Sequence, residues 1–366
     1  MERVRVGVIG TGQIGKHHLE RYSKIPQANV LAVADIDEAE ARRVAAKHGI
    51  PDVCTDFRQL LARQDIDAVD VCLHNNYHAP LTIEALRAGK HVYCEKPMAG
   101  AYPDALAMWE ESQRTGRKLS IQLSTLFSKN TKTAKRIIEE GRLGRIYHAR
   151  SVGYRRRGRP FVDGYGSRFF VHKPTSGGGA LYDMGVYHIA QILYLLGLPA
   201  VERVSGRVYQ ETPMDAQRGK DVPYGVEELG LGFVHLAGGA TLDIIEVWAV
   251  HMNKFEGSAI FGSQGGLRLD PFSFHSTFGD TPADATFDLE GADTRRHALD
   301  PNEEAYDSAQ HHWIAALQGR VELLPTAQIA LETMLISQGI YMSHELGREV
   351  TADEIRKNAR STALKV

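Results

Sequence analysis

The sequence predicts an α/β protein, with an N-terminal doubly wound parallel sheet followed by an α+β domain that has an open, mostly antiparallel sheet. In the first third of the chain, short apolar runs alternate with amphipathic stretches, which is typical of βαβ units. A glycine-rich motif follows the first apolar run, and later apolar runs succeed one another without intervening helices. A chain of 366 residues is long enough for about two domains, which we place at residues 1–123 and 124–366.

Each element of the first domain is predicted from its local pattern. Strands are expected at residues 4–9, 30–34, 68–73, 91–94 and 118–123. The run at 68–73 is continuously apolar, as a strand covered on both faces requires. Helices are expected at residues 14–24, 38–48, 79–88 and 101–115. Gly49 and Gly89 directly follow two of these helices, in the position where glycine most often ends a helix.

The second domain begins with an expected helix at residues 131–140 and a long strand at 145–155. Three consecutive glycines, Gly177 to Gly179, precede an apolar helix at 180–196. Further strands are expected at 201–210, 227–235, 240–250, 255–261 and 265–269, and helices at 305–317 and 327–344. Strands that follow one another without helices indicate antiparallel pairing.

The composition excludes several classes of function. Lys and Arg number 43 against 45 for Asp and Glu, so the net charge of −2 provides no basic surface for nucleic acid. No apolar run approaches the roughly 20 residues that span a membrane, and the first residues lack the pattern of a secretory signal. Cys54, Cys72 and Cys94 match neither a disulfide framework nor a zinc pattern. We therefore expect a cytoplasmic protein that binds no nucleic acid, membrane or metal.

Residues 10–15 form the pattern Gly-x-Gly-x-x-Gly between a strand and a helix, which is the context in which this turn binds a dinucleotide. Gly10 permits the tight turn, Gly12 lets the backbone approach a pyrophosphate, and Gly15 permits close packing of helix and strand. Gln13 and Ile14 open the helix, whose free N–H groups favour a phosphate.

Asp35 ends the next strand, 20 residues after Gly15, where its carboxylate can accept hydrogen bonds from both hydroxyls of the adenosine ribose. The same carboxylate would repel the 2′-phosphate of NADP, and Ile36 stands where an NADP-binding chain often has Arg or Ser. The pattern therefore favours NAD over NADP. The alternative is a glycine turn without a ligand, in which Asp35 caps the following helix.

Three further motifs follow in order: Asn75 with His78, Glu95-Lys96-Pro97, and the glycine-rich run at 177–185. With the glycine turn, they resemble the Gfo/Idh/MocA oxidoreductase family from the first strand to about residue 197. The resemblance implies a Rossmann domain, an open-sheet domain, and homodimers or homotetramers that pair through the outer face of that sheet. It also implies that Leu73, Asn75, His78, Glu95 and Lys96 border the cofactor.

Lys96 and Asp183 are the catalytic candidates that this resemblance implies. Lys96 would lie beside the nicotinamide and hydrogen-bond the substrate hydroxyl, and with a pKa lowered by burial and by the positive ring of the cofactor it would also take the proton. A surface ion pair with Glu95 is the structural alternative. Asp183 would hold a substrate hydroxyl and orient the proton-transfer group, although an acidic residue in a first helical turn also suits the helix dipole.

The fourth residue after Asp183 is Tyr187, where most family members have His, and His188 comes one step later. Residues in a helix turn by about 100° each, so the two side chains cannot face the same site equally. Some family members also have Tyr at this position, so we expect Tyr187 to be the proton donor or hydroxyl binder. His188 as a shifted catalytic histidine is the alternative, and both are candidates for substrate binding.

The basic segment that follows the strand at 145–155 is a weaker candidate. Alternation directs Tyr154 and Arg156 to one face of the strand, and Arg155 and Arg157 to the other. We expect Tyr154 and Arg156 to contact a polar or anionic substrate, with a solvated sheet edge as the alternative. Other candidates for the substrate wall are His172, Lys173 and Trp248. His74 and His78 have helical spacing but no third ligand in the sequence nearby, so they do not indicate a metal.

Together, these features predict an NAD-dependent oxidoreductase that transfers a hydride between nicotinamide and a secondary hydroxyl or keto group. The substrate class that we expect is a sugar, a sugar derivative or a cyclitol. Two alternatives stay open. One is redox-neutral glycoside or sugar–sugar chemistry through a transient keto-sugar on a tightly bound cofactor. The other is a nucleotide-sensing regulator without catalysis, against which the intact Lys96 and Asp183 argue.

We expect the chain to bind NAD more tightly than NADP, because the carboxylate of Asp35 favours ribose hydroxyls and repels a phosphate. Titration of the protein with each nucleotide, followed by fluorescence or calorimetry, measures both affinities. Tighter binding of NADP would contradict this expectation.

Overall fold

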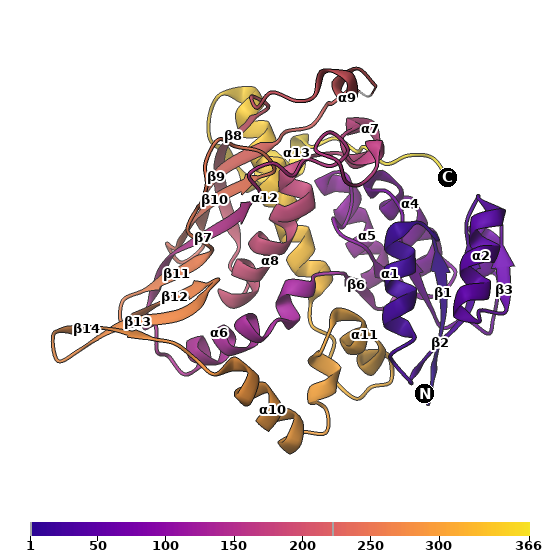
Figure 1. Cartoon of the computed structure of the whole chain (residues 1–366), viewed down its shortest axis with the longest axis horizontal. Coiled ribbons are helices and arrows are strands. Elements are labelled where there is room, and N and C mark those ends of the chain that lie inside the picture. The colour runs from indigo at the N-terminus through magenta and orange to yellow at the C-terminus, as the bar shows by residue number, and fades with distance from the viewer. Residues whose placement is uncertain (1, 222) are drawn as a thin grey trace.

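The computed structural model describes residues 2–221 and 223–366, and it confirms the expected fold class. Two sheets lie side by side with helices packed between them (Figure 1). The first sheet ends with a strand at Ile121, so we keep the proposed domain boundary at residue 123. No helix in the described ranges has both the length and the apolar character needed to cross a membrane.

The first sheet has six parallel strands in the order β3-β2-β1-β4-β5-β6. Its strands are β1 Val4–Ile9, β2 Ala28–Ala34, β3 Asp52–Cys54, β4 Ala68–Val71, β5 His91–Cys94 and β6 Leu119–Ile121. Its helices are α1 Gln13–Tyr22, α2 Glu38–His48, α3 Phe57–Leu61, α4 Asn75–Arg87 and α5 Tyr102–Thr115. The strand order reverses between β1 and β4, and the carboxyl ends of such strands form the usual dinucleotide site.

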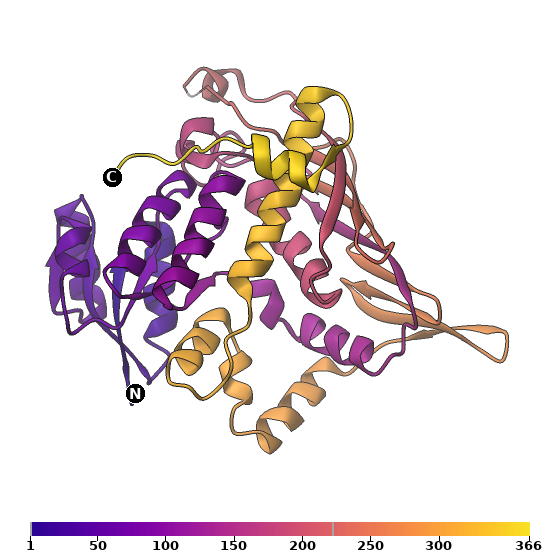
Figure 2. The same ribbon diagram turned by 180° about the vertical axis from the view of Figure 1, so that it is seen from behind.

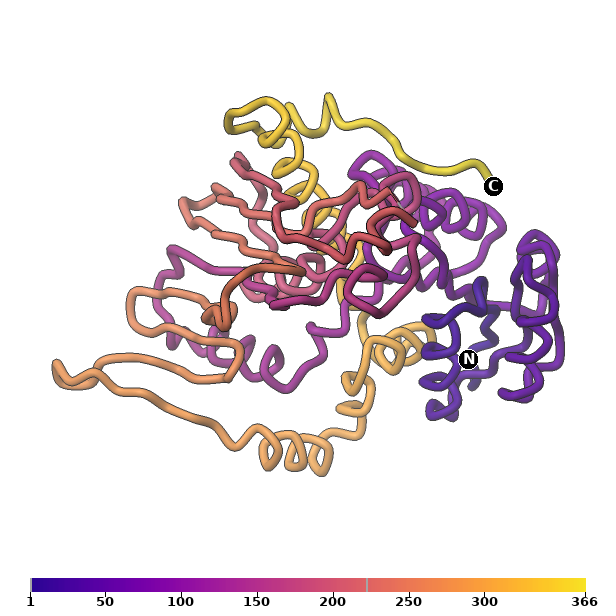
Figure 3. The backbone as a smooth tube through the Cα atoms, turned by 45° about the horizontal axis from the view of Figure 1, so that its top comes forward, coloured from indigo at the N-terminus to yellow at the C-terminus, as the bar shows by residue number. Residues whose placement is uncertain are grey.

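The second sheet has nine strands in the order β14-β13-β12-β11-β7-β10-β9-β8-β15. Its strands are β7 Ile146–Tyr154, β8 Val201–Tyr209, β9 Leu229–Leu236, β10 Thr241–Val247, β11 Ala259–Gly262, β12 Gly265–Leu269, β13 Phe272–Phe278, β14 Thr281–Ala285 and β15 Val350–Thr351. Only β7 and β10 pair in parallel, and every other neighbouring pair among the described strands is antiparallel. The hairpin of β13 and β14 projects from the body of the molecule (Figure 3).

The helices of the second half pack mainly against the face of this sheet that is turned toward the first domain (Figures 1 and 2). They are α6 Lys129–Glu139, α7 Lys173–Ser176, α8 Val186–Leu195, α9 Ala216–Asp221, α10 Leu289–Leu299, α11 Ala309–Leu317, α12 Thr326–Leu346 and α13 Ala352–Asn358. The long helix α12 contacts both α5 and β8 and so joins the two domains. The C-terminal segment then returns to the first domain, where Leu364 N–H donates to the carbonyl of Asn76 at 3.0 Å (Figure 3).

The other face of the second sheet carries no described helix in Figures 1 and 2. Strand alternation buries Leu242 and Ile244 of β10 and directs Ile245 to this outer face. Phe233 and Phe261 lie on the same face with 39% and 38% of their surface exposed. The outer face therefore presents partly exposed apolar side chains.

Several expected boundaries differ from the structure. The strand expected at 68–73 ends at Val71, because the chain turns into α4, which begins at Asn75 rather than at residue 79. The helix expected at 180–196 is divided into a π-helical turn, Leu181–Gly185, and the α-helix α8. The polar or short elements β3, α3, α10, β13, β14 and α13 were not expected, because they lack a long apolar period.

Candidate active site

The glycine turn lies at the carboxyl end of β1, and its geometry suits a bound pyrophosphate. Gly10 has a φ of +98°, and a Cβ there would lie 2.3 Å from the carbonyl oxygen of Cys72. A Cβ on Gly15 would lie 2.0 Å from the carbonyl oxygen of Gly10, so only glycine lets α1 pack this closely. At Gly12 a Cβ would meet no atom within 4 Å, which leaves the turn open to a ligand. Gln13 and Ile14 are exposed at the start of α1, which no side chain caps.

Asp35 closes the adenosine side of this turn. Its Oδ2 accepts hydrogen bonds from the N–H of Thr11 at 2.7 Å and from the hydroxyl of Thr11 at 2.9 Å. Asp37, not Asp35, caps α2, so the alternative role that the sequence left open for Asp35 is wrong. Ile36 is 96% exposed beside it and offers no cation to a 2′-phosphate. These residues fit NAD, and Thr11 is a contributor that the sequence analysis missed.

The residues that follow β4 hold the next part of the site, although they differ in what they present. Asn75 begins α4 and donates from Nδ2 to the carbonyl of Ser176 at 2.6 Å, which ties the first domain to the second. His78 is fully buried, and its ring nitrogens lie 2.7 and 3.0 Å from the carbonyl oxygens of Pro97 and Leu73. His78 therefore links the segment after β4 to the segment after β5, and it presents no free ring nitrogen to a ligand.

Lys96 and Asp183 form an ion pair between the two domains. Lys96 Nζ lies 2.9 Å from both Oδ1 and the main-chain oxygen of Asp183. The two side chains are 13% and 16% exposed, so solvent or a ligand can reach the pair. Burial would lower the pKa of Lys96, but Asp183, supported by Tyr187 and Glu95, outweighs burial and raises it above its usual value. The expectation that burial lowers this pKa is therefore wrong for the protein by itself, in which Lys96 holds its proton firmly.

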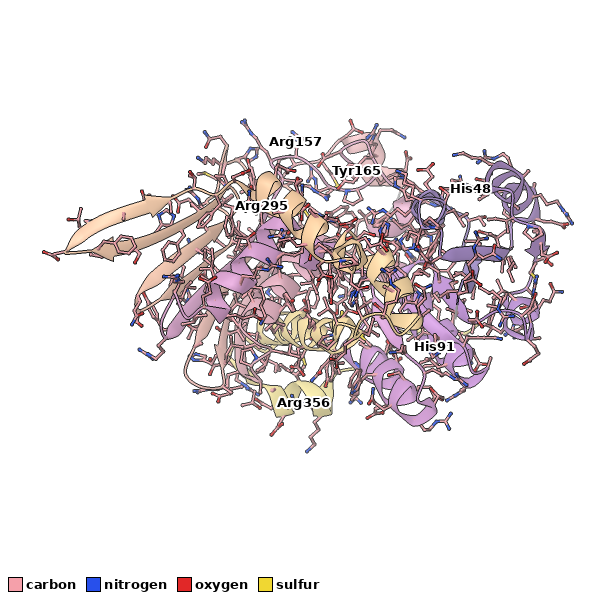
Figure 4. All side chains as sticks on the ribbon, turned by 90° about the horizontal axis from the view of Figure 1, so that it is seen from below. His48, His91, Arg157, Tyr165, Arg295 and Arg356 are labelled. Carbon is pink, nitrogen blue, oxygen red and sulfur yellow. The ribbon has the colours of Figure 1, made fainter. Side chains whose placement is uncertain are left out.

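The second oxygen of Asp183 has two further donors. Trp248 Nε1–H donates to Oδ2 at 3.0 Å, and Arg155 Nη1 donates to the same atom at 3.2 Å. Burial opposes the charge of Asp183, but Lys96 and Arg155 outweigh it and leave the pKa of this carboxyl below its usual value. Trp248 is fully buried and also a hydrogen-bond donor, so it belongs to both the core and the site. Tyr165, which bonds to Arg155, lies on the same side of the molecule as Arg157 in Figure 4.

A buried carboxylate holds the turn that carries Asp183. Glu227 accepts hydrogen bonds from the N–H groups of Gly179 and Leu181 at 2.9 and 3.0 Å, and from the hydroxyl of Tyr341 at 2.9 Å. A Cβ on Gly179 would lie 1.9 Å from the main-chain oxygen of Glu227, which explains the third glycine of the run. No sequence pattern indicates Glu227, because its partners are two main-chain groups and one hydroxyl far away along the chain.

Tyr187 and His188 face different neighbours. Lys96 Nζ lies 4.9 Å from the centre of the Tyr187 ring, so the phenol is part of the ion-pair site. His188 Nδ1 instead bonds to Glu246 at 3.0 Å, and Glu246 is fully buried against the sheet. The structure thus brings Tyr187, and not His188, to Lys96. This is the choice that the four-residue spacing from Asp183 predicts, and a π-helical turn, Leu181–Gly185, lies directly before α8.

The structure does not bring Tyr154 and Arg156 to this site. The Tyr154 hydroxyl bonds to the carbonyl of Met252, and Arg156 is exposed. β7 ends at Tyr154, so the expected alternation does not extend over Arg155 to Arg157. Arg155 is directed at Asp183, and a Cβ on Gly153 would lie against His188. Arg155 is therefore the arginine of the site. Lys173 is exposed, and His172 precedes the short helix α7.

Comparison with known proteins identifies the family. Residues 4–123 match the model described as an oxidoreductase family with an NAD-binding Rossmann fold, and residues 131–268 match the model of the GFO/IDH/MocA C-terminal domain. The chain belongs to the Gfo/Idh/MocA oxidoreductase family. It therefore carries an NAD-binding domain.

Individual relatives include sugar dehydrogenases. The chain is 27% identical over 355 residues to D-glucoside 3-dehydrogenase of Escherichia coli, covering 95% of this chain and 97% of that protein. It is 28% identical over 288 residues to levoglucosan dehydrogenase of Pseudarthrobacter phenanthrenivorans, with 73% of each chain covered. A structure of levoglucosan dehydrogenase with NADH and L-sorbose superposes with a TM-score of 0.78 at 22% identity, covering 96% of this chain and 99% of that one. The last similarity shows the shared fold.

The His188–Glu246 pair makes stability depend on pH. Burial opposes the charge of His188, but Glu246 outweighs it and raises the pKa of His188 above 6.5. The pair therefore contributes its full stability below about pH 6.5 and loses it as the pH rises through the raised pKa. We expect the difference in unfolding free energy between the wild type and His188→Gln to shrink as the pH rises. Urea unfolding at a series of pH values measures this difference, and a gap that widens with pH would contradict the assignment.

Proposed function

We propose that the protein is an NAD-dependent oxidoreductase acting on a secondary hydroxyl or keto group of a sugar, a sugar derivative or a cyclitol. The observation that carries this proposal is the partly exposed Lys96–Asp183 pair. Lys96 comes shortly after β5 in the NAD-binding domain, and Asp183 comes from the second domain. The relatives that act on glucosides and on levoglucosan support the substrate class. When bound, NAD exchanges a hydride with the substrate carbon.

The residues of this chain handle the oxygen and its proton. Lys96 is held as an ammonium by Asp183, so it is placed to donate a hydrogen bond to the substrate oxygen, or a proton to it during reduction of a ketone. In the oxidation of an alcohol the step runs in reverse, and the neutral amine of Lys96 takes the hydroxyl proton. Burial raises the pKa of Tyr187 above its usual value, so its phenol is a second proton donor beside Lys96. Asp183 accepts from a neighbouring substrate hydroxyl and orients Lys96. All three side chains thus form one polar wall.

Arg155 extends this wall beyond the residues expected from the sequence. Its Nη1 is engaged by Asp183 and by the carbonyl of Gly158, while Nε and Nη2 have no partner among the described residues. We propose that these two groups bind further oxygen atoms of the substrate. Several donors and acceptors around one carbon suit a molecule with several adjacent hydroxyls.

Redox-neutral chemistry through a transient keto-sugar is a second candidate. The position of Tyr187 against Lys96 favours it, because the family members with Tyr at this position include enzymes that exchange hydride between two sugars. Both candidates use the same wall of residues. They differ in whether reduced nucleotide leaves the protein. A non-catalytic regulator is less favoured, because such a protein has no need of the Lys96–Asp183 pair.

We propose that the protein forms homodimers or homotetramers through the outer face of the second sheet. Phe233, Phe261 and Ile245 lie on this face, which no described helix covers. A cytoplasmic location is also proposed. Its support is that Cys54, Cys72 and Cys94 are buried thiols and form no disulfide.

We expect NAD to be reduced in the presence of one class among cyclitols, monosaccharides and glycosides, and Lys96→Met to lower that turnover about 10²-fold or more. The reason is that the variant loses the charged donor to the substrate oxygen. Nicotinamide absorbance measures both rates. Lys129→Met is the matched control, because Lys129 pairs with Glu290 on the surface of the second domain. Near-normal turnover of Lys96→Met would contradict the mechanism. A different outcome would favour the redox-neutral candidate: NAD binds, no compound in the panel causes its reduction, and mass spectrometry detects altered glycosides.

Tyr187 and His188 are separated by the pH dependence of the rate. We expect Tyr187→Phe to lower kcat about 10²-fold, and His188→Ala to leave the acid limb of the profile in place, because only Tyr187 lies against Lys96. The measurement is kcat between about pH 5 and 10 for each variant. An ionisation above the usual histidine range that disappears in His188→Ala, with Tyr187→Phe unaffected, would reverse the assignment.

A further inference from the structure

A group of buried charges lies next to Lys96 on the side of the cofactor-binding helix. His18, in the second turn of α1, bonds through Nδ1 to Asp70 of β4 and through Nε2 to Glu95 after β5, each at 2.8 Å. His18, Asp70 and Glu95 are 1%, 0% and 3% exposed. The imidazole is thus clamped between two carboxylates in the interior of the first domain. Neither the sequence patterns nor the proposed mechanism gives His18 a role.

With both carboxylates ionised, the two hydrogen bonds need a doubly protonated ring. A neutral imidazole has one N–H and could donate to only one carboxylate, whereas the imidazolium donates to both. Burial opposes this charge, but the carboxylate of Asp70 outweighs it and holds the pKa of His18 well above its usual value. Burial also opposes the charge of Glu95, but His18 outweighs it and leaves the pKa of Glu95 below its usual value. The cluster is therefore an ion triad with one positive and two negative charges.

The other polar groups that face His18 support this charge state. The thiol of Cys72 in β4 donates to Asp70 at 3.3 Å, and burial raises the pKa of this thiol far above neutral pH. The ring of Tyr93 in β5 lies 5.7 Å from that of His18, and Tyr22 of α1 is buried beside the same groups. Burial raises the pKa of both phenols, so they stay neutral. Arg21 of α1 and Lys96 are the other charged groups that interact with this cluster.

A metal ion fits this cluster less well than a proton does. Nδ1 of His18, a carboxylate oxygen of Asp70 and Sγ of Cys72 lie within 4.8 Å of one another, as metal ligands do. However, His18 Nδ1 and Asp70 Oδ2 are 2.8 Å apart, which is a hydrogen-bond distance. Two such ligands on a tetrahedral zinc ion would lie about 3.3 Å apart.

The triad connects the two parts of the site that the proposed function requires. The first residues of α1 form the pyrophosphate turn, and the second turn of the same helix carries His18. Glu95, held by His18 through Oε1, accepts the main-chain N–H of Lys96 at 2.9 Å through Oε2. One imidazole therefore fixes the segment that carries Lys96 against the helix that begins at the cofactor turn.

We propose that His18 is a positioning residue for the proposed reaction: as an imidazolium it holds Glu95, and through Glu95 it sets the place of Lys96 relative to the bound nucleotide. The proposal rests on the proposed function for its effect on turnover. Its charge state and its hold on Lys96 do not depend on activity. His18→Gln removes the charge and keeps a hydrogen-bond donor of similar length. The exposed neighbour in α1, His17→Gln, is the matched control.

The effect on turnover is the first test. We expect His18→Gln to lower kcat about 10- to 100-fold, because misplacement of a catalytic group by about 1 Å costs this much, while the Kd for NAD changes less than about threefold. Because His18→Gln leaves two carboxylates facing each other, the double variant His18→Gln/Glu95→Gln provides a fold with less buried charge. We expect it to unfold at a higher temperature than His18→Gln and to remain slow. Normal kcat in either folded variant would overturn the proposal.

The second test needs no turnover. Nitrogen-15 NMR of labelled histidine distinguishes an imidazolium from a neutral ring, and we expect His18, assigned by its loss in His18→Gln, to stay doubly protonated at about pH 8. The amide signal of Lys96 should shift in His18→Gln and stay in place in His17→Gln. A neutral His18, or an unmoved Lys96 amide, would overturn the proposal. If these signals behave as expected but the wild type turns over no compound in the panel, the proposed function fails and the positioning of Lys96 stands.

Discussion

The ion pair of Lys96 and Asp183 is the interaction on which the organisation of the site depends. It joins the carboxyl end of β5 in the first domain to the π-helical turn of the second, over an N–O distance of 2.9 Å. Removing either partner would leave the other charge poorly compensated in a mostly buried place, which is costly. The pair also decides the chemistry, because Asp183 keeps the proton on Lys96 against the effect of burial. The same contact thus links the two domains and keeps Lys96 protonated.

The fold was largely predictable because local patterns determine it. The glycine turn, the apolar run of β4 and the helix-ending glycines each act over a few residues, and the parallel and antiparallel halves follow from whether helices separate the strands. The π-helical turn at Leu181–Gly185 was not predictable. Its first N–H group, that of Leu181, donates to Glu227, a residue far away along the chain that only the folded structure brings to it.

Site residues that belong to a sequence motif were predictable. Site residues whose role depends on a tertiary contact were not. Lys96, Asp183 and Tyr187 meet as expected because they belong to motifs with fixed positions relative to strand and helix ends. Arg155 was missed because it lies just beyond the end of β7, where the sequence does not say which residue meets Asp183. Without the positive ring of the cofactor, the pKa of Lys96 lies above its usual value and not below it, for a similar reason. Burial can be inferred from one strand, but the compensating charge comes from the other domain.

The charged groups of the site alternate in sign along a continuous path. Asp70, His18 and Glu95 lie in the first domain, Lys96 crosses the interface, and Asp183 and Arg155 follow in the second. Buried charges of this kind stabilise a fold less than apolar packing would, since each must be removed from water. This array of three positive and three negative side chains therefore lowers the folding stability of the chain, but it holds a particular geometry. The array begins in the helix of the nucleotide turn and ends at the substrate-binding wall, which is where an oxidoreductase must fix the distance between cofactor and proton donor.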